Sequence, residues 1–379
     1  MMNADTRRPG PVRLVDLSLG DPGYEPPEQA KAAAVSALGG GIGGYAPQGG
    51  FPWLRLALAA KLRESNNIAG DPDNIVVTSG ASHGLFAALS AVCRPGDRVL
   101  VPDPGFPLYR LAASILGLNA VGYPLAEASG YEPDWEALDE LLPGARVLIW
   151  NFPSNPLGVV APRAWHARIL DMLGRHAEVV MLSDEVYESL CFSGAHFSPA
   201  ACESGPADRI ISIFSFSKSH AMTGWRVGYL HASRELAATI ARHHWGVSMS
   251  TPTVAQVAAL AALRAPCAYL EGLRAFLLRN RDEAVRRLTA AGYACQPPNA
   301  GFFLWVDIER SGLDASTFTK RCAHEAGTLV SPGTDFSPAA RHRIRLSYAL
   351  SRHRLSEGLD RLIAWQDNLG ACHAPANDI

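Results

Sequence analysis

The sequence predicts an α/β fold with a mostly parallel sheet in a large domain and a smaller α+β domain. Short apolar runs rich in Val, Ile and Leu alternate with helical patterns along the first two thirds of the chain. Strands that read as continuous apolar runs are typical of sheets that helices cover on both faces. From about residue 254 the pattern changes to long helical stretches, which indicates a second domain. We expect the large domain over 46–268 and the small domain over 1–45 together with 269–379.

The individual elements follow from these patterns in chain order. The large domain carries five predicted strands, over 74–78, 98–101, 146–150, 178–182 and 209–214. Helical patterns follow the first three of them, over 82–92, from about 107 and from about 162. The small domain carries helical patterns to about 291, a strand over 301–308, a helix near 315–325 and a strand over 343–348. Strands that alternate with helices in this way favour βαβ units and a parallel sheet.

Composition and charge argue against several classes of protein. Hydrophobic residues make up 48 % of the chain and charged residues 18 %, and a charged share below the usual ~25 % indicates a large buried core. The net charge of −2 offers no excess of positive charge to nucleic acid or to an anionic membrane. The charge-free stretch 111–126 is too short to span a membrane, and 32–54 is interrupted by glycines.

The N-terminus and the cysteines bear on the location of the protein. Residues 1–13 have no apolar run after their arginines, so we expect no signal peptide. The seven cysteines are odd in number and form no CxxC pair, which argues against a disulfide framework and a zinc ribbon. Both observations favour a cytoplasmic protein with reduced thiols.

Residues that could bind a ligand or take part in catalysis follow the predicted strands. In open α/β sheets, ligands bind beyond the carboxyl ends of the strands. The residues found there are Ala81, Ser82, Phe106, Asn155, Asp184, Tyr187, Ser215 and Lys218. A helix N-terminus with small residues can hold a phosphate through its backbone N–H groups. Most lysines are solvated surface charges, but an amine at the end of an apolar strand, in this company, is a candidate nucleophile.

The stretch from Ser215 to Gly228, SFSKSHAMTGWRVG, resembles the pyridoxal-phosphate lysine signature of class I/II aminotransferases, the fold type I enzymes similar to aspartate aminotransferase. Four further motifs match the family in order, and the resemblance covers roughly residues 14–365. The matching motifs are LGDP at 19–22, the Tyr…Gly…Leu-Arg element at 45–55, SDEVY at 183–187 and RLSY at 345–348. The family's Asn-Pro-Thr-Gly loop is also present at 155–158, with Leu157 in place of the usual Thr.

This resemblance implies a role for each residue around the cofactor ring, which the large domain would hold. Lys218 would be the Schiff-base lysine and would then move the proton at the substrate Cα. Asp184 would pair with the pyridine nitrogen and keep the ring protonated, so that the ring accepts electrons. Tyr187 and Asn155 would hydrogen-bond the phenolic oxygen of the ring, and Phe106 would stack on its face.

The resemblance also implies how phosphate and substrate are bound. The phosphate would be held by Ser215, Arg226 and the backbone amides of Ala81 and Ser82. The guanidinium of Arg226 suits this role because it offers several N–H donors in one plane. Tyr45 matches a tyrosine that reaches the phosphate of the partner subunit, which implies a homodimer with shared active sites. The substrate α-carboxylate would be held by Arg345, with Gly20 and Asn155.

The expected function is therefore that of a pyridoxal-phosphate-dependent aminotransferase. It would move an amino group between an L-amino acid and a 2-oxo acid, with 2-oxoglutarate as the acceptor that the family implies, by a ping-pong mechanism. Ser82 stands where some aspartate-specific relatives carry a Lys, and 244–252 contains no Arg, so neutral or aromatic donors are favoured over acidic ones. A lyase, cyclase or oxidase that uses the same cofactor stays open as an alternative.

Three other motifs have competing interpretations. Residues 80–84 satisfy GxSxG, which would make Ser82 the nucleophile of an α/β-hydrolase and leave the lysine motif unexplained. Residues 39–44 satisfy GxGxxG but follow a helical pattern instead of a strand, so we read them as a helix end. The run 242–245, RHHW, has no metal-binding spacing and indicates a substrate or dimer contact; we expect no metal.

Overall fold

The computed structural model describes residues 14–193, 196–202 and 205–371. The N-terminal residues 1–13, Cys372 and the rest of the C-terminal segment lie outside this part. The chain divides into two compact units. The larger unit comprises 24–275 and 299–301, and the smaller unit comprises 1–23, 276–298 and 302–379.

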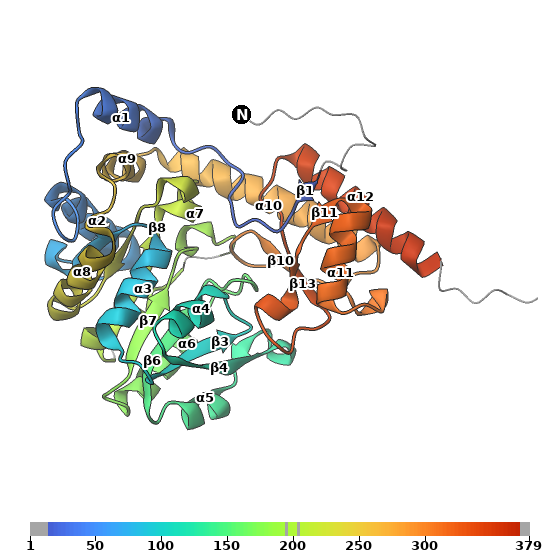
Figure 1. The fold of residues 1–379 in the computed structure, drawn as a ribbon, viewed down its shortest axis with the longest axis horizontal. Coiled ribbons are helices and arrows are strands. Elements are labelled where there is room, and N and C mark those ends of the chain that lie inside the picture. Colours follow the sequence, from blue (N-terminus) through green and yellow to red (C-terminus); the bar gives the residue numbers. More distant parts are fainter. Residues whose placement is uncertain (1–13, 194–195, 203–204, 372–379) are drawn as a thin grey trace, which may run out of the picture. The chain divides into compact units, whose positions relative to one another are not determined.

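An eight-stranded sheet forms the centre of the larger unit (Figure 1), in the order β2-β9-β8-β7-β6-β3-β4-β5. Its strands are β2 (Ile75–Thr78), β3 (Arg98–Asp103), β4 (Asn119–Ala126), β5 (Glu132–Pro133), β6 (Ala145–Asn151), β7 (Val180–Asp184), β8 (Ile210–Ser215) and β9 (Gly228–His231). The pairs β3–β4, β3–β6, β6–β7 and β7–β8 are parallel, whereas β9 is antiparallel to both of its neighbours. The expected mostly parallel sheet is confirmed.

Helices cover both faces of this sheet because successive buried residues of its strands point to opposite sides. Val76 and Ile213 belong to a core with α3 (Ala81–Val92), α4 (Leu108–Ile115) and α8 (Arg234–Ser248). Their neighbours Val77 and Phe214 belong to a second core with α1 (Glu28–Gly39), α2 (Pro52–Asn66) and α9 (Thr253–Leu263). The remaining helices of this unit are α5 (Trp135–Leu141), α6 (Arg163–Gly174) and the short α7 (Phe216–Ser219).

The smaller unit has two small sheets. One pairs β1 (Val15–Asp16) with β11 (Thr328–Leu329), and the other has the order β10-β13-β12. The strands of the second sheet are β10 (Phe303–Asp307), β12 (Ser331–Pro332) and β13 (Arg343–Ser347). Its helices are α11 (Ala315–Arg321), α12 (Arg352–Ala371) and the C-terminal part of α10 (Cys267–Ala290), whose first residues belong to the larger unit. This mixture is the expected α+β character.

The glycine run at 39–44 follows helix α1, as predicted, and the next helix, α2, begins only at Pro52. A dinucleotide fingerprint requires a strand before its glycines and a helix directly after them, so this run does not meet that requirement.

Of the described helices, none is on its own both long and apolar enough to cross a membrane. The pair α9 and α10, which meet at an angle of 91°, passes the same test jointly, by length and composition only.

Candidate active site

The sequence-predicted residues of the larger unit gather at one edge of the eight-stranded sheet. Strands β3, β6, β7 and β8 are parallel, so their carboxyl ends lie at this edge, and the topology brings the end of β2 and the start of β9 there as well. Phe106, Asn155, Asp184, Tyr187, Ser215 and Lys218 follow or end these strands, Ala81 and Ser82 follow β2, and Arg226 precedes β9. Loops at a common edge of an α/β sheet are where such folds bind ligands.

Asp184 is a buried carboxylate at the end of β7. Its Oδ2 accepts a hydrogen bond from the Tyr109 hydroxyl at 2.7 Å, and its Oδ1 accepts one from the Val186 N–H at 3.3 Å. Burial raises the pKa of Asp184, these two hydrogen bonds and the charge of Lys218 partly offset the rise, and the net pKa is about 6. A carboxylate taken out of water in this way is stabilised by a positively charged partner.

Asn151, the last residue of β6, connects the loop that follows it to the end of β7, a role that no motif in the sequence predicts. Its side-chain amide donates to the backbone carbonyl of Asp184 at 3.1 Å, and its Oδ1 accepts from the Asn155 N–H at 3.0 Å. Both asparagines are buried. The loop that carries Asn155 is thus tied directly to the end of β7.

The N-terminus of α3 and Arg226 form a cradle for an anion. The residue before the helix is Gly80, which has no side chain to accept from the first-turn amides of Ala81 and Ser82. Arg226 adopts a left-handed conformation with φ 55° and donates to the carbonyls of Thr223 at 2.8 Å and Ser79 at 3.3 Å. A helix N-terminus beside a guanidinium suits a phosphate group.

Gly80 itself is required by this arrangement. Its φ is +85°, and a Cβ there would lie 2.3 Å from Nη2 of Arg226. Any side chain would therefore displace the guanidinium from the anion cradle, which is consistent with backbone that closely approaches a ligand.

A pair of histidines supports the same loop. The Ser79 N–H donates to Nε2 of His244 at 3.3 Å, and the His244 ring packs on that of His83 at a centroid distance of 4.5 Å. Burial lowers the pKa of both rings, and Arg226 adds to the effect at His83. His244 and its neighbour His243, which contacts Ser90, thus have packing partners in α3 and its preceding loop. In residues 14–193, 196–202 and 205–371, no cluster of three or more His, Cys, Asp and Glu is placed to hold a metal.

Lys218 and Ser215 lie at the junction of β8 and α7. Ser215 is the N-cap of this short helix, and its Oγ accepts from the Ser217 N–H at 3.0 Å. Tyr187 is buried, at 3 % exposure, whereas Tyr45 in the loop between α1 and α2 is 80 % exposed. Arg226 is also an exposed residue among the predicted cofactor contacts of this unit.

Gly20 and Arg345 belong to the smaller unit. Arg345 lies on β13, is buried at 7 % exposure, and its guanidinium carbon lies 4.0 Å from the centroid of the Phe303 ring. Its Nη2 donates to the carbonyl of Ser18 at 2.7 Å, so the segment that contains Gly20 runs beside it. The guanidinium is held in one orientation by these contacts.

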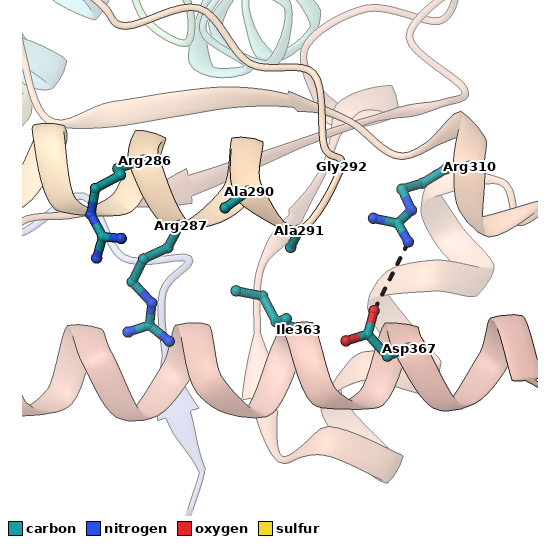
Figure 2. A pocket seen from close by; sticks show the side chains of 8 residues that line it. All are labelled: Arg286, Arg287, Ala290, Ala291, Gly292, Arg310, Ile363 and Asp367. Atoms are coloured by element: carbon teal, nitrogen blue, oxygen red, sulfur yellow. Dashed lines mark ion pairs between the residues drawn. The ribbon is translucent and has the colours of Figure 1, made fainter.

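A pocket of about 740 Å³ elsewhere in the smaller unit contains none of the predicted site residues (Figure 2). Three arginines line it, and each pairs with a carboxylate: Arg286 with Glu283 at 2.9 Å, Arg287 with Asp360, and Arg310 with Asp367 at 3.9 Å. Since these charges compensate one another, the pocket offers no excess charge to an anionic ligand.

The chain is similar to aminotransferases over nearly its whole length. The family model for aminotransferases of class I and II matches residues 12–362. The aspartate/prephenate aminotransferase of Thermus thermophilus is 35 % identical over 364 residues, which is 94 % of this chain and 92 % of that protein. The arginine–pyruvate transaminase of Pseudomonas aeruginosa is 35 % identical over 348 residues, which is 91 % of this chain and 88 % of that protein.

Solved structures give the same result. The aspartate aminotransferase from Thermus thermophilus with maleate matches with a TM-score of 0.88 at 35 % identity, over 93 % of this chain and 92 % of that one. The chain therefore belongs to the class I and II aminotransferases, and it is a pyridoxal-phosphate-dependent transferase of amino groups with the aspartate aminotransferase fold.

Proposed function

We propose that this enzyme transfers an amino group between a neutral or aromatic L-amino acid and a 2-oxo acid by a ping-pong mechanism. The observation that carries the assignment is the meeting of Lys218, Asp184 and the Gly80–Arg226 anion cradle at one sheet edge. Bound there, pyridoxal phosphate supplies a carbonyl that condenses with amines and a protonated ring that accepts the electrons released at the substrate Cα.

Each residue of the site would have a separate role in cofactor binding, catalysis or substrate binding. Lys218 Nζ binds the cofactor covalently and, once the substrate amine displaces it, takes and returns the proton at Cα. Asp184 holds the positive charge of the ring nitrogen, while Tyr187 and Asn155 donate to the ring oxygen. Phe106 covers the ring face, and Ser215, Arg226 and the amides of Ala81 and Ser82 bind the phosphate. Arg345, with Gly20 and Asn155, binds the substrate carboxylate.

The preference for uncharged donors is supported by the segment around 244–252. It contains no Arg, and it presents Trp245, Val247 and Met249 with exposed fractions of 49 %, 63 % and 42 %. Arg242, the nearest guanidinium before it, donates to Thr239 on the same helix at 3.0 Å. An apolar segment favours an apolar substrate side chain over a carboxylate.

We also propose a homodimer with shared sites and a cytoplasmic location. The 80 % exposure of Tyr45 supports a role in a partner subunit's site. The cysteines Cys93, Cys191, Cys202, Cys267, Cys295 and Cys322 are all free in the described part of the chain, which is consistent with a reducing compartment.

Visible absorption of the purified enzyme tests the proposed reaction. We expect a cofactor band that bleaches with aromatic or neutral amino acids, bleaches less with aspartate, and returns when a 2-oxo acid is added. Lys218→Ala should lose the covalent band and turnover together. New bands that 2-oxo acids do not reverse would instead indicate a lyase, cyclase or oxidase. A stronger response to aspartate than to phenylalanine would refute the substrate preference.

A further inference from the structure

We propose that Tyr109 is a positioning residue that keeps the shared proton on the cofactor's ring nitrogen instead of on Asp184. This inference rests on the proposed role of Asp184 as the partner of that nitrogen. Tyr109 lies in the first turn of α4, outside the sequence motifs that match the family.

The geometry around Asp184 assigns one donor to each carboxylate oxygen. The Tyr109 hydroxyl donates to Oδ2 at 2.7 Å, and the Val186 backbone N–H donates to Oδ1 at 3.3 Å. Tyr109 is 1 % exposed and Asp184 is 7 % exposed, so water does not replace the phenol. The side-chain donor comes from α4 and the backbone donor from the turn after β7, which fixes the plane of the carboxylate from two sides.

The ring of Tyr109 is held independently of its hydroxyl. It packs edge-on against Phe106 at a centroid distance of 5.7 Å and an interplanar angle of 85°, and it belongs to the core between the sheet and α3, α4 and α8. Removal of the hydroxyl alone therefore leaves the ring packing in place.

The phenol can act only as a donor to Asp184. Burial, followed by the neighbouring charge of Asp184, raises the pKa of Tyr109 well above its ordinary value, so the hydroxyl stays protonated. A hydrogen bond donated to a carboxylate stabilises its ionised form and lowers its affinity for a proton.

This donation matters because Asp184 is buried. Burial and, to a smaller extent, the adjacent charge of Glu185 raise the pKa of Asp184, whereas Tyr109, the Val186 N–H and Lys218 lower it, and the net pKa is about 6. Without the phenol, Asp184 would hold a proton more strongly and would compete for the proton on the ring nitrogen. A neutral ring nitrogen withdraws electrons less, so the loss of the Cα proton would slow.

Tyr109→Phe tests the proposal, with Tyr123→Phe as the matched control. Tyr123 is also fully buried, but its hydroxyl donates at 2.9 Å to the backbone carbonyl of Ile149. Each full-length variant is loaded with pyridoxal phosphate labelled with ¹⁵N in the ring, and the ¹⁵N chemical shift is measured against pH. We expect a protonated nitrogen in the wild type and Y123F, and a shift toward the unprotonated value in Y109F. The kcat of Y109F should fall about tenfold, with little change in KM, as for one hydrogen bond to a charged group.

Two further variants keep the outcomes separate. Incorporation of 3,5-difluorotyrosine at position 109, a stronger donor, should restore or increase protonation of the nitrogen, which a packing role would not do. An unchanged ¹⁵N shift in Y109F, or equal shifts in Y109F and Y123F, would overturn the role of Tyr109. If D184N also leaves the ¹⁵N chemical shift of the ring nitrogen unchanged, the proposed role of Asp184 fails. If D184N changes this chemical shift and Y109F does not, Asp184 keeps its role and Tyr109 does not.

Discussion

At the residue scale, Arg345, which we propose binds the substrate carboxylate, has a guanidinium that is already held in place. Its guanidinium lies between the rings of Phe303 and Phe336, with its carbon 4.0 Å and 4.7 Å from their centroids. Nη2 also donates to Ser18 and Ser331. A guanidinium that is already ordered loses little further entropy when it binds a carboxylate, so more of the interaction contributes to affinity.

Arg345→Ala should raise KM for amino donors by roughly 100-fold, the effect of a lost charge-assisted pair, and lower kcat less. Arg343→Ala is the matched control, because Arg343 lies on the same strand and pairs with Asp307 at 2.9 Å. Steady-state kinetics on both variants would decide the matter. An unchanged KM in R345A, or an equal rise in R343A, would mean that another group binds the carboxylate.

The sequence could predict Asp184 but not its partner Tyr109, and the reason is physical. Asp184 could be placed because the end of a strand fixes which edge of the sheet a residue occupies. Tyr109 lies 75 positions away, and its contact with Asp184 depends on β6 lying between β3 and β7. The spacing of Phe106 and Tyr109 was the available signal, because residues three apart lie on the same side of a helical turn. It could have placed Tyr109 on the same side as the predicted cofactor contact Phe106.

At the element scale, a partly buried ion pair joins α2 to the segment that follows Tyr187. Lys61 on α2 pairs with Glu188, and Asn66 donates to the same carboxylate at 2.5 Å. Burial lowers the pKa of Lys61, but the charge of Glu188 and hydrogen bonds outweigh it and raise the pKa above its ordinary value. The ammonium also lies 4.9 Å from the centroid of the Phe214 ring. This pair holds the turn after β7 against the helix.

Lys61→Met should destabilise the fold by about 2 kcal/mol, because it leaves the partly buried Glu188 without its cation. Lys31→Met should destabilise the fold much less, since Lys31 pairs with the largely exposed Glu25 and Glu28. Urea unfolding of both holoenzyme variants measures the difference. Equal losses would show that the Lys61 pair contributes no more than a surface pair.

Gly80→Ala should weaken cofactor binding more than it weakens the fold, because the new Cβ would collide with Arg226. We expect at least a tenfold rise in the dissociation constant of pyridoxal phosphate from the apoenzyme, comparable to one lost charged hydrogen bond. Gly174→Ala at the end of α6 is the control, since nothing lies within 4 Å of a Cβ there. If G80A binds the cofactor as tightly as G174A, the cradle does not depend on a bare backbone.

Among the elements, the strong apolar runs were predictable and the irregular strands were not. The five predicted strands correspond to β2, β3, β6, β7 and β8, with ends that differ by one or two residues. Strand β4 was missed because its sequence, NAVGYPLA, contains Gly and Pro, which are rare inside strands. Strand β9 was missed because it has only four residues, GYLH, and begins at Gly228, the last residue of the lysine motif.

At the scale of the whole molecule, the strand order could not be read from the chain. The order β2-β9-β8-β7-β6-β3-β4-β5 places β3 between β6 and β4, and inserts β9 antiparallel between β2 and β8. Local patterns predict which segments are strands, whereas the order depends on how helices pack across the completed sheet. The resemblance to a known family supplied the location of the site without that order.

Buried histidines give the folded molecule a common response to acid. Burial lowers the pKa of His166 to about 3 and the pKa values of His220, His231 and His244 to about 4, from an ordinary value of 6.5. Below pH 6.5 the unfolded chain binds protons that the folded chain does not, so stability falls as the pH drops toward 4. Asp184, with its pKa raised to about 6, acts in the opposite direction below pH 6. Because the four histidines outnumber this one carboxyl group, we expect a net loss of stability as the pH falls.

The apoenzyme should therefore lose stability steeply between pH 6.5 and 4, by about 1.4 kcal/mol per pH unit for each net proton taken up on unfolding. Urea unfolding at constant ionic strength, at several pH values from 7 to 4.5, measures this slope. His244→Gln should reduce the slope by about one proton, because its amide oxygen can still accept from Ser79 without titrating. His353→Gln, at an exposed histidine on α12, is the matched control. Two outcomes would contradict this prediction: a free energy of unfolding that stays constant down to pH 4.5, or equal slopes in H244Q and the wild type. Either would mean that the folded chain protonates these histidines. Their burial would then contribute nothing to the acid response.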